Sequence, residues 1–254
     1  MGQIIVEKRG NVVAVTLDLP PVNALTLARY QEITNIFDEI SGRDDVHCAV
    51  LAARGEKAFC AGLDLREFKE ATVEKDPERA AIVRATFKAI QTCAIPVIAA
   101  VNGPALGAGC ALAVNCDIRI ASERATFGLP EINVGRCGGG RFVGRLISQG
   151  MMRLMFFTGK PIDAAEALRV GLVEKVVPQE KLESTVFEIA NLIASKSPLG
   201  LRLGKQSLNE SEVLPVHEGY IVEQGYSTKL LATEDAREAA RAVLEKREPR
   251  FVGR

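Results

Sequence analysis

The stretch Val101-Asn102-Gly103-Pro104-Ala105-Leu106-Gly107-Ala108-Gly109-Cys110-Ala111-Leu112 joins an apolar run at residues 95–101 to a run of small residues at 108–114. Its turn is rich in glycine and proline, a pattern typical of a strand that leads into the start of a helix. The first N–H groups of a helix have no partner within it, and the small residues 107–109 let another molecule approach them. Such donors can bind an oxygen atom that becomes negatively charged.

A second stretch has the same construction. Ala58-Phe59-Cys60-Ala61-Gly62-Leu63-Asp64-Leu65 follows an expected strand at residues 48–53 and leads through a glycine turn into an expected charged helix at residues 66–71. One turn of this kind is more often explained by close packing. Two of them offer two N–H donors, and two donors can hold one oxygen atom.

The composition is that of an ordinary soluble globular protein. The chain has 254 residues, 47% of them hydrophobic and 25% charged, which is enough for a sizeable core. Lys plus Arg and Asp plus Glu both number 32, so the basic excess typical of nucleic-acid-binding proteins is missing. No apolar run reaches the roughly 18 residues needed to span a membrane, and no signal-peptide pattern precedes Ile4. We therefore expect a cytoplasmic protein that binds neither nucleic acid nor membranes.

Cysteine and histidine usage argues against a metal site. The six cysteines are Cys48, Cys60, Cys93, Cys110, Cys116 and Cys137. They show no C-x-x-C spacing, so we expect reduced thiols. The two histidines, His47 and His217, are too few for a typical histidine-based metal site, and we expect neither a bound metal nor a Ser/His triad.

Periodicity predicts an α/β core. A β-hairpin is expected to turn at Gly10-Asn11, and Thr26 is placed to cap a helix that extends to about Ile40. Residues 69–79 are polar, so we expect a mobile surface segment there, followed by a long helix at about residues 78–92.

The last section of the chain, from Pro198, is helical by periodicity, with helices expected at about residues 199–209, 216–231 and 234–245. Three helices cannot bury all of their apolar faces by themselves, so they are expected to dock on the main body or on another subunit. We therefore divide the chain into a core with the candidate site, residues 1–197, and a C-terminal helical region, residues 198–254.

Several further motifs occur in a definite order. They are Pro21-Val22-Asn23-Ala24-Leu25, residues 59–65, residues 96–112, Cys116-Asp117-Ile118, Phe127-Gly128-Leu129-Pro130-Glu131, Thr158-Gly159, Ala164-Ala165-Glu166-Ala167 with Gly171-Leu172-Val173, and Glu245-Lys246-Arg247-Glu248-Pro249. Each is weak alone, but in their order and spacing they resemble the crotonase superfamily, the enoyl-CoA hydratase/isomerase proteins, over nearly the whole chain. The resemblance implies a spiral of repeated β-β-α units with a C-terminal helical oligomerisation region. Such regions build trimers, which often pair into hexamers.

The resemblance also implies a site for acyl-coenzyme A thioesters as substrates, with no permanently bound cofactor. By position, the backbone N–H groups of Leu63 and Ala108 would form an oxyanion hole, and Glu131 would transfer protons. A carboxylate that follows Leu129-Pro130 among apolar residues is expected to be partly desolvated, which raises its pKa. The residues expected to bind the substrate are Val22, Ala24, Ala61, Gly62, Leu63, Asp64, Leu65, Gly107, Ala108 and Pro130.

Two departures from the hydratase pattern bear on the reaction. The pattern has a second glutamate two residues after the glycine cluster, where this chain has Ala111. The loop at residues 135–141 is shorter than the pattern and carries Arg136 and Arg141, which face either solvent or the acyl pocket. An arginine in the pocket would indicate an acyl group with a carboxylate or another polar end, because a buried unpaired guanidinium is costly.

Three functions are compatible with these residues. The favoured one is enoyl-CoA double-bond isomerisation, because a single carboxylate can take a proton from one carbon and return it to another. The alternative among enzymes is a hydratase or hydratase-lyase that acts on an unusual acyl group. The alternative of another class is a non-catalytic binding or scaffold protein, which a failure to bind acyl-CoA would favour.

Overall fold

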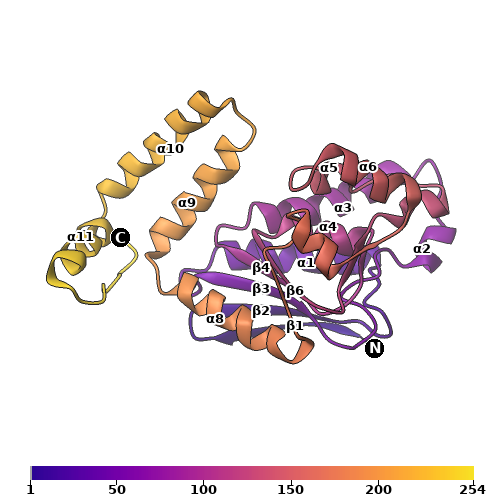
Figure 1. The fold of residues 1–254 in the computed structure, drawn as a ribbon, viewed down its shortest axis with the longest axis horizontal. Helices are drawn as coiled ribbons and strands as arrows, with labels where there is room; N and C mark the ends of the chain where they lie inside the picture. Colours follow the sequence, from indigo (N-terminus) through magenta and orange to yellow (C-terminus); the bar gives the residue numbers. More distant parts are fainter. Residues whose placement is uncertain (1) are drawn as a thin grey trace.

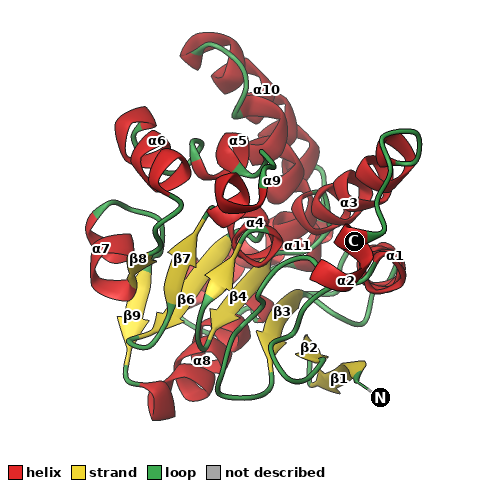
Figure 2. Ribbon diagram, turned by 90° about the vertical axis from the view of Figure 1, so that its right-hand side faces the viewer, coloured by secondary structure: helices red, strands yellow, loops and turns green. Residues whose placement is uncertain are grey.

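The central strands carry apolar side chains on both faces, and this decides how the layers stack. The structure, a computed structural model, describes residues 2–254. In β2 (Val12–Asp18), β3 (Cys48–Ala53) and β4 (Val97–Val101), most side chains are buried whichever way they point. Successive side chains of a strand point to opposite faces, so such a sheet must be covered on both sides. Figure 2 shows helices on both sides of the sheet.

The main sheet has six strands in the order β1-β2-β3-β4-β6-β9. Its other strands are β1 (Gln3–Arg9), β6 (Ile118–Ser122) and β9 (Lys175–Val177). β1 and β2 pair antiparallel, which confirms the predicted hairpin, and the pairs from β2 to β9 are parallel. Parallel neighbours need long crossover connections, and the helices supply them.

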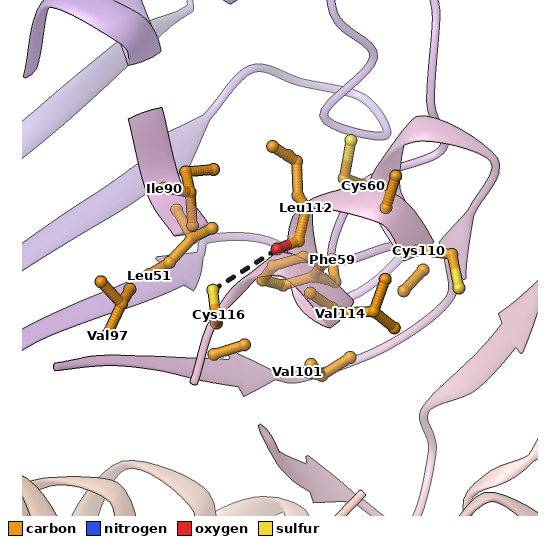
Figure 3. Close-up of a cluster of buried hydrophobic side chains, with 14 of the residues drawn as sticks. Leu51, Phe59, Cys60, Ile90, Val97, Val101, Cys110, Leu112, Val114 and Cys116 are labelled. Atoms are coloured by element: carbon orange, nitrogen blue, oxygen red, sulfur yellow. Dashed lines mark hydrogen bonds between the residues drawn. The ribbon is translucent and has the colours of Figure 1, made fainter. Parts of the chain in front are cut away.

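One face of the sheet packs against three helices. They are α1 (Leu27–Ser41), α3 (Asp76–Gln91) and α4 (Ala108–Asn115). Val13 and Leu51 point to this side and join a single large cluster with apolar side chains from all three helices. Figure 3 shows part of it, with Ile90 beside Leu51 and Leu112 beside Phe59. The Oγ1 atom of Thr26 accepts a hydrogen bond from the N–H of Arg29, so the predicted cap of α1 is confirmed.

The other face packs against α8 (Leu182–Ala194). Val12 and Val50, which point away from the first cluster, pack there with Val186 and Ala190. The alternation of side chains along β2 and β3 therefore divides the apolar residues between two layers, with the sheet in the middle.

A second, smaller sheet has three strands. It contains β5 (Ala105–Leu106), β7 (Thr126–Gly128) and β8 (Ile162–Asp163), in that order. Isolated bridges extend the same arrangement to earlier turns of the chain, joining Cys60 to Ala105 and Leu25 to Leu63. Each turn thus adds a long strand, a short strand or bridge, and a helix, which is the predicted spiral of β-β-α units.

The remaining elements of the core are short. They are α2 (Leu65–Lys69), the 3₁₀ helix η1 (Pro130–Val134), α5 (Gly140–Val143), α6 (Gln149–Thr158), α7 (Ala164–Arg169) and the 3₁₀ helix η2 (Gln179–Lys181). Among residues 2–254, no helix is both long enough and apolar enough to cross a membrane.

The start of α3 corrects one expectation. The helix begins at Asp76, not at residue 78, so the end of the predicted surface segment at residues 69–79 is helical. Pro77 and the acidic side chains of Asp76 and Glu78 suit a first helical turn, where the unpaired N–H groups favour negative charge and where proline loses no hydrogen bond.

Three helices form the C-terminal region, close to where periodicity predicted them. They are α9 (Pro198–Ser211), α10 (Val216–Leu231) and α11 (Glu234–Glu245). Figure 1 shows α10 and α11 lying away from the main sheet. The Oγ atom of Ser197 caps α9, so the expected boundary between residues 197 and 198 coincides with a helix start.

One face of α9 holds this region against the core. The Arg202 guanidinium donates to the carbonyl oxygen of Ser41, and the Asn209 amide donates to that of Gln91. Between them, the Lys205 ammonium lies 2.7 Å from Oδ2 of Asp117 and 3.1 Å from the carbonyl oxygen of Ile95. These side chains are three and four residues apart, so they lie on the same side of the helix.

Candidate active site

The two predicted donor turns lie side by side. The N–H of Cys60 donates to the carbonyl oxygen of Pro104, and the N–H of Leu106 donates to that of Cys60. These bonds are the bridge between the first turn of the spiral and β5. Two segments separated by more than forty residues of sequence are thereby held in register.

Glycine makes this contact possible. A Cβ atom on Gly109 would lie 2.0 Å from the carbonyl oxygen of Cys60, so α4 can approach the first turn only if this residue has no side chain. Gly62 has a φ of +94°, which L side chains rarely adopt, and a Cβ there would lie 2.8 Å from the carbonyl oxygen of Leu106 and 3.4 Å from the N atom of Ala108. Gly62 therefore brings the first turn against the start of α4.

Each turn presents a free N–H group. Ala108 is the first residue of α4, a position whose N–H has no partner within the helix. The bridge between Leu63 and Leu25 is formed by the residues on either side of Leu63. The N–H of Leu25 donates to the carbonyl oxygen of Gly62, and the N–H of Asp64 donates to the carbonyl oxygen of Leu25. Within residues 2–254, the N–H groups of Leu63 and Ala108 donate no hydrogen bond. Both remain available to an oxygen atom of a ligand.

The carboxyl group of Glu131 lies next to this pair of donors. Glu131 stands in η1, which follows β7, and the N–H of Gly107 bonds to the carbonyl oxygen of Gly128 at the end of that strand. A Cβ on Gly107 would lie 3.1 Å from Oε1 of Glu131. The turn that ends in the Ala108 donor is therefore in contact with the carboxyl group.

The carboxyl group of Glu131 is largely removed from water. Its Oε2 atom is buried and, within the described part of the chain, has no hydrogen-bond partner. Burial raises the pKa of the Glu131 carboxyl, because a charge is less stable away from water. A hydrogen bond from its own backbone N–H offsets part of this rise in the pKa of Glu131. A desolvated carboxylate with one unpaired oxygen is nevertheless a stronger base than one in a salt bridge.

These groups open into a cavity of about 550 Å³. Ala111, which occupies the position of the second glutamate of the hydratase pattern, lines it and is buried. No acidic side chain can reach the cavity from that position. The predicted residues that line it are Ala61, Gly62, Leu63, Leu65, Gly107, Ala108, Pro130 and Glu131.

Aromatic side chains form an apolar part of the wall. The rings of Tyr30 and Phe87 meet edge to face with centroids 6.3 Å apart, and those of Phe87 and Phe142 with centroids 5.4 Å apart. The carbonyl oxygen of Tyr30 accepts hydrogen bonds from the hydroxyls of the buried Thr34 and Thr86. α1 and α3 are thus joined directly behind the cavity wall.

Comparison with known proteins agrees with this arrangement. Residues 7–254 match the family model described as Enoyl-CoA hydratase/isomerase. The chain belongs to this family, within the crotonase superfamily. It is 38% identical over 251 residues to the short-chain-enoyl-CoA hydratase of Clostridium acetobutylicum, covering 97% of this chain and 96% of that protein. It is 35% identical over 255 residues to the crotonyl-CoA hydratase of Syntrophomonas wolfei, covering 99% of this chain and 98% of that protein.

Solved structures agree at the level of the fold. The crystal structure of an enoyl-CoA hydratase from Bacillus anthracis superposes with a TM-score of 0.95 at 36% identity, covering 99% of each chain. The predicted crotonase-like fold of this enoyl-CoA hydratase/isomerase family member is therefore confirmed.

Three of the residues expected to bind the substrate lie outside the cavity wall. Val22 accepts a hydrogen bond from the N–H of Ala61 through its carbonyl oxygen, so its segment supports the first donor turn from behind. Ala24 belongs to the same segment and is half-buried. Asp64 turns away and pairs with Arg66 at 2.6 Å, which holds the pKa of its carboxyl below the usual value. Their contact with coenzyme A stays a prediction.

The structure also separates the two loop arginines. Arg136 lines the cavity, where its guanidinium lies 3.0 Å from Oδ1 of Asp76. Arg141 is exposed and does not line the cavity. The sequence left open whether these two arginines face solvent or the pocket. In the structure Arg136 faces the pocket and Arg141 faces solvent.

Sequence reasoning missed part of the wall. Tyr30, Phe87 and Phe142 were not singled out, and Arg79 was assigned to a surface segment, yet all four line the cavity. The signal for Arg79 was its spacing from Val83 and Phe87, at steps of four residues on one face of α3.

Proposed function

We propose that this protein acts on enoyl-CoA thioesters by forming a thioester enolate, with Glu131 moving the proton, and that its favoured reaction is a shift of the double bond. The thioester oxygen is bound by the N–H groups of Leu63 and Ala108. Donors fixed in place before the reaction stabilise the charge that develops on that oxygen, typically by about 3 kcal/mol for each donor.

The observation that carries this proposal is the buried Oε2 atom of Glu131, which has no hydrogen-bond partner within the described residues and lies beside two free N–H donors. A fold gains nothing in stability from such a carboxylate. Its position is explained if a substrate C–H group lies there, because the carboxylate can accept that proton while the enolate oxygen is bound nearby.

Isomerisation needs only this one carboxylate. In a 3-enoyl-CoA, Glu131 takes a proton from C2, and the C–H electron pair forms a dienolate whose oxygen lies between the two N–H donors. The same carboxylic acid then returns the proton to C4, leaving the double bond between C2 and C3. Atoms and charge balance without water or any other co-reactant.

Hydration is the second candidate, and the names of the relatives favour it, since both of those described above are hydratases. Water must add to C3 of a 2-enoyl-CoA while a proton reaches C2. Two carboxylates share this work easily, but Ala111 leaves Glu131 to hold and activate the water alone.

The two reactions can be compared directly in one experiment. Rates are measured with a 3-enoyl-CoA and with the matching 2-enoyl-CoA in water enriched in oxygen-18, and the products are identified by mass. Faster conversion of the 3-enoyl-CoA without label supports isomerisation. Rapid incorporation of label into the 2-enoyl-CoA, with the 3-enoyl-CoA untouched, would instead make this protein a hydratase with a single glutamate.

We also propose that the C-terminal helices assemble the chain into a trimer or a dimer of trimers, and that coenzyme A enters the site only as part of the substrate. The exposed apolar side chains of α10 and α11 support the assembly.

A further inference from the structure

The wall that α3 contributes to the cavity changes character along the helix. Asp76, Arg79, Val83 and Phe87 line the cavity in steps of three or four residues. Phe87 is buried, Val83 and Arg79 are half-buried, and the first turn of the helix is charged. Arg79 and Phe87 are eight positions apart, which corresponds to about 12 Å along a helix axis. A chain-like ligand lying along this wall would have an apolar segment at one end and charged groups at the other.

Positive charge is in excess at the charged end. Arg79 of α3 and Arg136 of the loop after η1 line the cavity near Asp76, and Arg84 lines it one helical turn before Phe87. Asp76 pairs with Arg136, whose side chain is 38% exposed. Among the described residues that line the cavity, there are thus three guanidinium groups and one carboxylate besides that of Glu131. A cavity lined with one sign of charge attracts ligand groups of the opposite sign.

These arginines lie close to Glu131 and Tyr30. The N–H of Arg136 bonds to the carbonyl oxygen of Glu131 at 2.9 Å. The charge of Arg79 acts on the hydroxyl of Tyr30, where it partly offsets the rise in pKa that burial causes. Neither residue lies on a donor turn. With the thioester oxygen at the donors and C2 at Glu131, the rest of the acyl group continues toward Tyr30, Phe87 and these arginines.

We infer that this site takes acyl-CoA thioesters whose acyl chain ends in a carboxylate, and that Arg79 and Arg136 bind that carboxylate. The inference rests on the proposed placement of the thioester. A guanidinium presents two parallel N–H groups that match the two oxygens of a carboxylate, whereas a methyl end offers it no partner. The aromatic wall accommodates the methylene groups between the two polar ends.

The test is a comparison of binding that needs no turnover. Hexanoyl-CoA and adipoyl-CoA have the same number of acyl carbons and differ in the terminal carboxylate, and because both are saturated neither can undergo the proposed isomerisation or hydration. Their dissociation constants are measured by titration calorimetry at low salt. We expect adipoyl-CoA to bind about tenfold more tightly.

Substitutions identify the residues responsible. Arg79→Gln and Arg136→Gln are each expected to reduce the preference for adipoyl-CoA several-fold and to leave the affinity for hexanoyl-CoA nearly unchanged. Asp76→Asn removes the competing carboxylate and should increase the preference. Arg141→Gln, a matched loss of an arginine outside the cavity, should change neither affinity.

Two outcomes would overturn the inference. One is equal affinity of the native protein for both thioesters. The other is a loss of affinity in Arg79→Gln and Arg136→Gln that is equal for adipoyl-CoA, hexanoyl-CoA and free coenzyme A, since the arginines would then bind the phosphates of coenzyme A. Both outcomes are independent of the rate comparison, so the proposed reaction can stand if this inference fails.

Discussion

Glu131 has an arrangement that a stable fold normally avoids. A buried carboxylate oxygen without a donor loses its hydration and regains nothing, which costs about 1–3 kcal/mol for a typical buried polar group. The same lack of partners keeps the carboxylate basic. The proposed role in proton transfer and the stability of the fold therefore make opposite demands on this residue.

The first prediction concerns activity. Glu131→Gln keeps the size of the side chain and removes the base, so turnover should fall by about a hundredfold to ten-thousandfold. Because the proposed function has the thioester bound by backbone N–H groups, the dissociation constant for a saturated acyl-CoA should change little. Steady-state kinetics and calorimetry measure the two quantities, and retention of most of the turnover would remove Glu131 from the mechanism.

The second prediction concerns the effect of pH on stability. Burial raises the folded-state pKa of Glu131 above its unfolded value, so ionisation favours the unfolded chain. The native protein should lose stability as the pH rises from about 4.3, the ordinary value for glutamate, through the raised pKa. Glu131→Gln lacks this loss and should be about 1 kcal/mol more stable at neutral pH, with no difference below pH of about 4. Calorimetric melting across this range checks the sign, and a variant less stable than the native protein at neutral pH contradicts it.

The third prediction separates a backbone role from a side-chain role. Proline is well tolerated at the first position of a helix, which is where Ala108 stands, so Ala108→Pro should fold while lacking the N–H donor. Turnover should fall by about a hundredfold or more. Leu63→Ala, which keeps its N–H, should retain most of its turnover. Circular dichroism verifies the fold of both variants, and near-normal turnover of a folded Ala108→Pro would exclude the donor.

At the scale of the elements, α9 depends on a few polar contacts. Lys205 is 6% exposed, and its ammonium bonds to Asp117, which also accepts a hydrogen bond from the N–H of Val97. One carboxylate therefore holds both the start of β4 and the middle of α9. Removing one partner of a buried ion pair leaves the other without compensation.

The fourth prediction follows from this ion pair. Lys205→Met preserves most of the side-chain length but leaves Asp117 unpaired, and because Asp117 keeps some contact with water the loss should be about 2 kcal/mol in the free energy of unfolding. Lys196→Met, an exposed lysine just before α9, is the matched control and should have little effect. Urea unfolding measures both. Equal stability of the two variants would show that α9 is held by its apolar contacts instead.

Elements with a local signal could be predicted from the sequence. The hairpin at Gly10-Asn11, the cap at Thr26 and both donor turns depend on residues close together in the chain, and glycine positions identified the turns. The paths of residues 69–79 and 135–141 depend on distant contacts. Arg79 faces the cavity because α3 packs against α1, and the loop that separates Arg136 from Arg141 turns at Gly135 and Gly139, both with positive φ. Neither property is visible in a local pattern.

At the scale of the whole molecule, the C-terminal region leaves apolar side chains in solvent. Val216 of α10 is 84% exposed and Ile221 of the same helix 67%, while Leu244 of α11 is 84% exposed. Single exposed apolar residues are common, but several on neighbouring helices mark an interaction surface. Figure 1 shows these helices lying clear of the sheet, so the core of the same chain does not cover them.

Ile221 offers a direct test of the proposed trimer. A stable interface buries about 800 Å² on each partner and is most sensitive to charge at its apolar centre. Ile221→Glu places a carboxylate on this surface of α10, whereas Ile221→Leu keeps it apolar. Sedimentation velocity at micromolar concentration should show a trimer or hexamer for the native protein and for Ile221→Leu, and mostly monomer for Ile221→Glu. A native protein that sediments as a monomer would contradict the proposed assembly. A trimer that persists in Ile221→Glu would place its interface on another face, because a charged side chain without a partner cannot be buried at the centre of a contact without weakening it.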